Sequence, residues 1–249
     1  MGSCRRKALA RVVMAGLCLV LASCTASYIP ETELETVEKE DLDTAYWWRV
    51  KFRIHWPKDQ EQDFSLHPLI ADQVIAPVLL SRGESMELWR FHRRAARDAA
   101  GHQFSFIYFA NRDTANEVNH AIRDNPVTQD LLASGMLDRV IYDSGKSNQQ
   151  TAVEATSDPN WPDEIQKSWP SYIMGVSATW LDLIQQFKAD SPPPQDANIH
   201  EMKRYYTTLN ARVTDQWGRY GRHAYLHHLN AVFGYEPLFI KQTGTWEKF

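Results

Sequence analysis

The sequence predicts an α+β domain in which a small mixed sheet of about three to four strands is covered by helices and followed by a helical C-terminal third. Three observations support this class. Residues 46–56 alternate with period two, which is typical of a strand with one buried face. Residues 171–189 and 198–233 carry apolar side chains at helical spacing. Residues 102–143 show a strand-helix-strand order.

The first strand separates an apolar face from a basic face, because its side chains alternate Trp48, Val50, Phe52, Ile54 and Trp56 with Arg49, Lys51, Arg53 and His55. A helical stretch is expected from His67 onward, and Pro77 should kink or end it. Residues 84–100 predict a further helix, because Leu88, Phe91, His92, Ala95 and Ala99 fall on one side. Gly101 would provide its C-terminal stop.

Residues 102–110 are largely apolar and predict a central strand. Asp113 is a candidate cap for a helix that should end before Pro126, because the residue preceding a proline disfavours the helical conformation. Residues 128–134 predict one or two further helical turns. Residues 139–143 predict a short third strand.

Residues 144–168 form a polar loop in this interpretation. The strong amphipathic helix at 171–189 is ended by a serine and three prolines, and a second, longer helical pattern occupies 198–233. Residues 237–240 predict a last edge strand.

The N-terminus carries a separate signal. A basic segment (Arg5, Arg6, Lys7, Arg11) precedes an uncharged apolar run at residues 12–22, which is too short to span a bilayer. The run ends in Leu21, Ala22, Ser23 and Cys24. This stretch resembles the lipobox of bacterial lipoproteins, and each of the four residues matches its position in that pattern.

The resemblance implies that residues 1–23 are removed as a signal peptide and that Cys24 becomes the lipidated first residue of the mature protein. Several acyl chains, such as palmitate, hold a protein stably on a membrane. Thr25 stands where an Asp would favour inner-membrane retention, so the resemblance implies the outer membrane, with the protein facing the periplasm. The alternative is an ordinary secretory signal peptide, cut for example after Ala26.

Residues 24–45 are interpreted as an acidic tether and residues 46–249 as one globular domain. Seven acids fall within the thirteen residues 31–43, and like charges favour an extended, solvated segment. The domain after it is nearly balanced, with 22 basic and 24 acidic residues, which argues against a nucleic-acid-binding protein. The chain has three cysteines; two would leave with the signal peptide and the third would carry lipid, so disulfides and thiol chemistry are not expected.

Two groups of cations are the best binding candidates. Arg49, Lys51 and Arg53 line the polar side of the first strand, and Arg90, Arg94 and Arg97 form a stripe on the predicted helix. Together they would make an anionic-partner surface for lipid head groups, a glycan phosphate or an acidic protein patch. The alternative is a solvated face paired with the domain's own acids, and the sequence does not place the two groups on one side.

His223 and His227 are four residues apart, so on a helix they share a face, which is the geometry of a metal-ligand pair. No third ligand can be assigned; His200, Glu201 and Glu236 are candidates. The alternative is a pair of amphipathic histidines that lie partly buried or at an interface.

Other motifs are incomplete. Gly145-Lys146-Ser147 lacks the first glycine of a P-loop, and the segment around Ser177 lacks the last glycine of a nucleophile elbow. The sequence therefore favours a membrane-anchored, non-enzymatic binding or accessory protein of the bacterial envelope, with no cofactor and no nucleic acid. The alternative is a periplasmic hydrolase or metal-dependent enzyme that uses His223 and His227.

Overall fold

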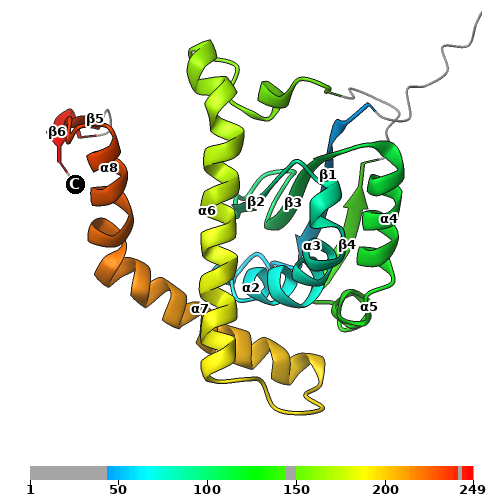
Figure 1. Ribbon diagram of the computed structural model, residues 1–249. Helices are drawn as coiled ribbons and strands as arrows, with labels where there is room; N and C mark the ends of the chain where they lie inside the picture. Colours follow the sequence, from blue (N-terminus) through cyan, green and yellow to red (C-terminus); the bar gives the residue numbers. More distant parts are fainter. Residues whose placement is uncertain (1–43, 144–149, 241–242, 249) are drawn as a thin grey trace, which may run out of the picture. The chain divides into compact units, whose positions relative to one another are not determined.

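The computed structural model describes residues 44–143, 150–240 and 243–248. Its centre is a four-stranded sheet in the order β2-β3-β1-β4 (Figure 1). The strands are β1 (Tyr46–Ile54), β2 (Leu88–Arg94), β3 (Gln103–Ala110) and β4 (Leu137–Tyr142). The predicted α+β class is confirmed. Where a mixed sheet was expected, each neighbouring pair is antiparallel.

β1 forms as its alternation predicts. Trp48, Val50, Phe52 and Ile54 point into the main core and are almost fully buried. The predicted central strand is confirmed as β3, which pairs with β1 on one side and β2 on the other. All eight of its residues are buried, because a central strand loses both its edges to neighbouring strands and its faces to packed side chains.

The helix predicted at residues 84–100 is wrong, because residues 88–94 form β2. Leu88, Arg90, His92 and Arg94 alternate with Trp89, Phe91 and Arg93, so the segment also satisfies period two. Pairing with β3 over seven residues decides between the two periods. A hairpin loop follows, in which Gly101 adopts a φ of +57° and Asp98 accepts hydrogen bonds from the amides of Ala100 and Gly101.

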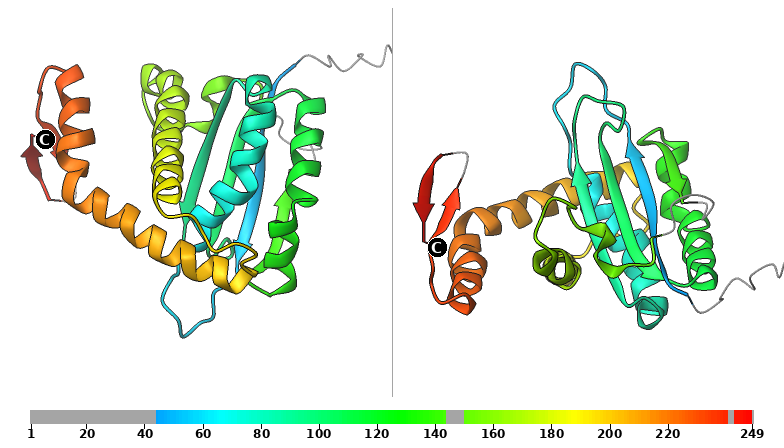
Figure 2. Two further views of the ribbon diagram at one scale, coloured as in Figure 1. Left: turned by 60° about the horizontal axis from the view of Figure 1, so that its bottom comes forward. Right: turned by 90° about the horizontal axis from the view of Figure 1, so that it is seen from above.

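Helices cover the face of the sheet that carries the main core (Figure 2). The first is a continuous stretch of α2 (Leu66–Ile70), a π-helical turn η1 (Ala71–Ile75) and α3 (Ala76–Arg82), which continues past Pro77. The proline sits at the start of α3, directly after the π-helical turn. A short 3₁₀ turn, η2 (Gly83–Ser85), leads to β2.

The crossover from β3 to β4 contains α4 (Arg112–Arg123) and α5 (Pro126–Ala133). The caps are Asn111 and Asn125, whose side chains accept hydrogen bonds from the first-turn amides; Asp113, the expected cap, lies inside the first turn. The apolar side of α4 packs into the main core through Ala115, Val118 and Ile122.

After β4, a 3₁₀ turn η3 (Val153–Thr156) leads to α6 (Asp163–Asp190), which runs beside β2 (Figure 1). α6 begins eight residues before its predicted start at Ser171, because the helix tolerates Pro170 within its first turns. The hydroxyl of Ser177 accepts a hydrogen bond from the amide of Phe91 at 3.0 Å. This contact satisfies a donor on the outer edge of β2.

The predicted second long helix is confirmed as α7 (Ile199–Gly221), a π-helical turn η4 (Arg222–His227) and α8 (His228–Val232). It starts at a capping box made by Asn198 and Glu201. The strand predicted near residue 238 forms as β5 (Leu238–Ile240), but it pairs with β6 (Thr245–Glu247) in a separate hairpin instead of the main sheet.

A buried polar network joins three helical segments. Asp72 of η1, whose side chain is 1% exposed, lies 2.8 Å from the Nζ atom of Lys188 in α6. The same carboxylate accepts hydrogen bonds from the hydroxyl of Tyr206 in α7 and from Gln73. The Lys188 ammonium and these donors compensate for the burial of the Asp72 charge.

Within the described residues, no helix combines the length and the apolar character needed to cross a membrane.

Candidate functional site

The strand register places the two predicted groups of cations on one face of the sheet. Ile107 of β3 is opposite Arg49 on one side and Arg90 on the other. Ser105 is likewise between Lys51 and His92, and Gln103 between Arg53 and Arg94. Residues directly opposite in an antiparallel pair project to the same face. Five of the six predicted cations therefore share the face that the helices leave uncovered.

Two further residues belong to this surface, which we call the basic sheet face. His92 lies between Arg90 and Arg94 along β2, and Arg139 of β4 is opposite Arg53. The complete face consists of Arg49, Lys51, Arg53, Arg90, His92, Arg94 and Arg139. The period-two pattern of residues 88–94 contained the signal for His92, but a helical interpretation of that segment conceals it.

The pKa values of two side chains on this face reflect their position among like charges. Partial burial of the ring lowers the pKa of His92, and the neighbouring charges of Arg90, Arg94 and Arg49 lower it further. Burial also lowers the pKa of Arg90 to about 10, and the charge of Arg49, which lies on β1 across β3, contributes to this shift. The imidazole of His92 and the guanidinium of Arg90 are therefore held among like charges, with β3 between the two rows.

Three of the cations have partners at the margins of the face. Arg90 donates to the hydroxyl of Thr156 at 2.9 and 3.0 Å, and Arg94 forms an ion pair with Asp98 at 2.7 Å. Arg53 donates to backbone carbonyls of the β2–β3 loop, including that of Ala99.

Four members keep their polar atoms available. Within the part of the chain that the structure describes, the side chains of Arg49, Lys51, His92 and Arg139 form no hydrogen bond and no ion pair. His92 and Arg139 are exposed, while Arg49 and Lys51 are half-buried.

Arg97 is not part of the face, which corrects the sixth assignment. It follows β2 in the hairpin loop, with its guanidinium 3.3 Å from the centre of the Trp56 ring. It also donates to the carbonyls of Pro57 and Gln60, at 3.0 and 2.7 Å. Arg97 therefore links the β2–β3 loop to the loop that follows β1. The chain leaves β2 before residue 97, so the helical spacing that was expected to place Arg97 beside Arg94 does not exist.

One end of the face is covered and apolar. Trp47, Ile107 and Phe109 form a small cluster with Leu88 and with the η3 segment. The indole of Trp47 donates to the carbonyl of Val153 at 3.0 Å. This contact fixes η3 across the end of the sheet and limits the polar surface to the remaining part of the strands.

Between the cations of β1 and those of β2, the surface of β3 is neutral. Ser105 and Gln103 of β3 are buried, and the amide of Gln103 donates to the Ser105 hydroxyl at 3.3 Å. The arrangement is suited to contact with several anionic groups at once. The Ser105 hydroxyl is too deeply buried, at 2% exposure, to act as an attacking group.

The histidine pair lies on η4, away from this face. The rings of His223 and His227 stack with centres 5.1 Å apart, and the ring of His228 lies 5.6 Å from the first. Among the described residues, no group of three potential ligands is arranged to hold a metal ion. His200 and Glu201 lie at the start of α7, roughly 30 Å along the helix from η4, so they cannot complete such a site.

A second cluster was not recognisable in the sequence. The buried ring of His67 in α2 accepts a hydrogen bond at Nδ1 from Nε of Arg93, at 2.9 Å. Its Nε2 atom lies 3.1 Å from Nε2 of His102, in the residue before β3. Because Nδ1 is an acceptor, the proton of His67 resides on Nε2 and is donated to His102. Burial, with the charge of Arg93, lowers the pKa of His67 well below its usual value.

Cys24 and the segment that resembles a lipobox lie outside the described residues, so lipidation stays a prediction. Most of the acidic tether also lies outside the described residues. Comparison with protein-family models gives no match, and comparisons with curated proteins and with solved structures give no significant similarity.

Proposed function

We propose that the protein is a lipid-anchored, non-enzymatic component of the bacterial envelope that binds a polyanionic partner through the basic sheet face. The observation that carries this proposal is the register of the sheet, in which β3 pairs with β1 and β2, β1 pairs with β4, and the cations of β1, β2 and β4 lie on one face. The resemblance of residues 21–24 to a lipobox supports the anchor, and Thr25, which stands in place of an Asp, supports a location at the outer membrane facing the periplasm.

The spacing of the charges favours a partner with repeated anionic groups. Neighbouring cations along β1 are two residues apart, which is about 7 Å in a strand. β1 and β2 are separated by β3, so their rows are roughly 10 Å apart. A single small anion would reach one or two of these side chains, whereas a phosphate-bearing polymer or an array of head groups would reach most of them.

The shortage of compensating acids among the described residues supports the same conclusion. Within the described residues, Asp98 and Asp138 are the carboxylates paired with cations at the margin of the face, through Arg94 and His55. Arg49, Lys51 and Arg139 have no such partner among those residues. A polyanion would relieve their mutual repulsion, so its binding should also stabilise the fold.

A binding experiment tests the proposal. The chain from residue 24 onward, with Cys24→Ser to remove the lipid, is titrated with polyphosphate, with heparin and with uncharged dextran. A cation near an anionic surface contributes about 1 kcal/mol. The variant Arg49→Gln/Lys51→Gln should therefore bind the polyanions about 30-fold more weakly, because about 1.4 kcal/mol corresponds to a factor of ten.

The matched control removes two exposed cations from α7, as Arg204→Gln/Arg219→Gln. It should bind like the unmodified chain, and binding should weaken steeply with added salt. Equal losses in both double variants, or equally tight binding of dextran, would refute the assignment of the face.

The anchor has its own test. Cells that express the full-length protein are labelled with a palmitate analogue, and the protein is purified from outer- and inner-membrane fractions. The label should appear on the unmodified chain in the outer-membrane fraction and be absent from Cys24→Ser. Equal labelling of both chains would exclude Cys24 as the lipidated residue.

A further inference from the structure

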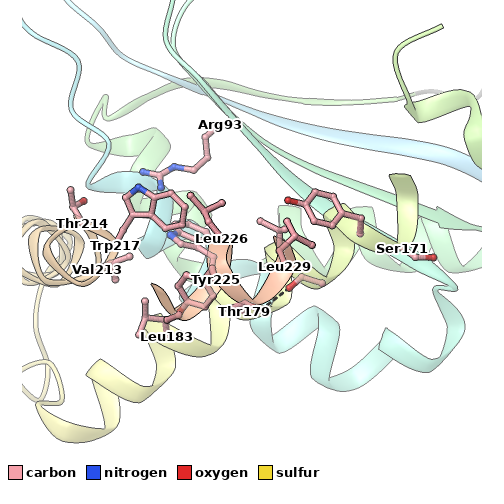
Figure 3. Close-up of a pocket in the computed structure, with 15 residues that line it drawn as sticks. Arg93, Ser171, Thr179, Leu183, Val213, Thr214, Trp217, Tyr225, Leu226 and Leu229 are labelled. Atoms are coloured by element: carbon pink, nitrogen blue, oxygen red, sulfur yellow. Dashed lines mark hydrogen bonds between the residues drawn. The ribbon is translucent and has the colours of Figure 1, made fainter. Parts of the chain in front are cut away.

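An apolar groove lies beside α6, away from the basic sheet face. It has a volume of about 780 Å³ and lies between α6 and the α7–η4–α8 segment (Figure 3). Its walls are mainly aliphatic and aromatic, and include Val176, Leu183, Val213, Trp217, Leu226 and Leu229. Pockets of this size and lining are typical of sites for small apolar or amphipathic molecules.

Much of this wall is exposed to water. Trp217 is 55% exposed and Val176 is 44% exposed, although both side chains face the same groove. Contiguous exposed apolar surface of this kind marks a binding site more often than the rest of a protein's surface does. An occupant would therefore need a long apolar part that covers both helices.

Among the described residues, a single charged side chain lines the groove. Arg93 is the one ionised side chain among the described residues that line it, and it projects from the end of β2 (Figure 3). Its Nε atom is held by Nδ1 of His67 at 2.9 Å, and its guanidinium lies 4.8 Å from the centre of the Trp180 ring. The charge is thus fixed in position at the groove.

The terminal nitrogens of Arg93 remain available. No described residue accepts a hydrogen bond from either Nη atom, and no described carboxylate lies within ion-pair distance. Arginine presents these donors as a planar fork that matches the oxygens of a carboxylate or phosphate.

The other polar groups of the groove are few. Its hydroxyl groups belong to Ser171, Thr179, Thr214 and two tyrosines, and that of Thr179 already donates to the carbonyl of Gly175 at 2.8 Å. A sugar or nucleotide would find little to replace its hydration. The lining therefore suits a ligand with one anionic end and an otherwise apolar body.

We propose that this groove binds a single-chain amphiphile of the fatty-acid class, with the anionic head on Arg93 and the tail between α6 and the α7–η4–α8 segment. This site is independent of the proposed polyanion surface, which lies on the opposite face of the sheet. The His67–His102 pair has a positioning role here, because it holds Nε of Arg93 and leaves both Nη atoms to the ligand.

The test uses saturated fatty acids of increasing length and the alcohols of the same lengths, titrated into the Cys24→Ser chain and followed by tryptophan fluorescence and calorimetry. Burial of a methylene contributes about 0.8 kcal/mol, so affinity should rise roughly fourfold per added methylene until the tail fills the groove. Each acid should bind at least tenfold more tightly than its alcohol, because only the acid can form the charged hydrogen bonds with Arg93.

Two variants separate head from tail. Arg93→Gln should reduce the affinity for each acid to that for its alcohol and leave the alcohols unchanged. Val176→Trp, at an exposed position in the wall, should fill the groove and weaken acids and alcohols alike by at least tenfold. Arg219→Gln, which lies on α7 outside the groove, should bind both series like the unmodified chain.

Three results would overturn the proposal: no saturable binding of any acid, equal affinity for acids and alcohols, or acid binding that Val176→Trp leaves unchanged. Sedimentation provides an independent check on the occupant. If the chain dimerises and Val176→Trp makes it monomeric without any effect of fatty acid, the groove belongs to a second copy of the chain and the assignment fails.

Discussion

The buried His67 ring should make the fold sensitive to mild acid. In the folded chain, its Nδ1 accepts from Arg93 and its Nε2 donates to His102, so a second proton would break the contact with Arg93. Burial and the Arg93 charge lower the pKa of His67 well below its usual value. In the unfolded chain the same ring titrates at about 6.5.

The direction of this pH dependence follows from the number of protons that the folded and the unfolded states bind. Below a pH of about 6.5 the unfolded state binds a proton that the folded state does not, so the free energy of unfolding falls as the pH falls. For one histidine that stays neutral when folded, the loss between about pH 7 and about pH 5 is about 2 kcal/mol.

The measurement is urea unfolding of the Cys24→Ser chain at several pH values in this window, followed by tryptophan fluorescence. His67→Gln keeps an acceptor for Arg93 but removes the titration, so its stability should fall by about 2 kcal/mol less than that of the unmodified chain. His120→Gln, at an exposed position on α4, serves as the matched control and should keep the full pH dependence. If His67→Gln lost as much stability in acid as the unmodified chain, the reasoning from the buried ring would be refuted.

Two further predictions concern the contacts that join α6 and α7 to the rest of the fold. Tyr206→Phe removes a donor from the buried carboxylate of Asp72 and should lower the free energy of unfolding by about 1.5 to 3 kcal/mol, which chemical denaturation would measure; a change below the experimental error would contradict it. Burial and the charge of Asp72 raise the pKa of Tyr206, so stability should also decline above about pH 10, and less steeply in the variant. Ser177→Ala leaves the amide of Phe91 without its acceptor and should cost about 1 to 3 kcal/mol in the same assay; an unchanged midpoint would mean that another group satisfies this donor.

The sequence predicted elements whose local pattern has one interpretation. β1 combines strict alternation with large apolar side chains on a single face, and α7 begins at the capping box of Asn198 and Glu201. The segment that forms β2 satisfies both the helical and the strand period. Only its pairing with β3, which lies beyond a hairpin loop, decides between them, and that tertiary contact is not written in the local pattern.

Most cations of the candidate site were predicted from the sequence, but His92, Arg139 and the arrangement of the face were not. Five of the six cations occupy one face because Ile107, Ser105 and Gln103 of β3 each lie between a residue of β1 and one of β2. A register of this kind cannot be derived from charge spacing alone. The contact of His67 with His102 joins residues that are 35 positions apart, so no motif in the sequence connects them.

The central claim is that the basic sheet face is the surface by which the protein contacts a polyanionic partner. Photocrosslinking in living cells tests it directly, with a photoreactive amino acid placed at Lys51 on the face or at Asn116 on the exposed side of α4. The account predicts one dominant crosslinked envelope component from position 51, lost in the presence of Arg49→Gln and Arg139→Gln, and none from position 116. The same products from both positions, or none from position 51, would contradict it.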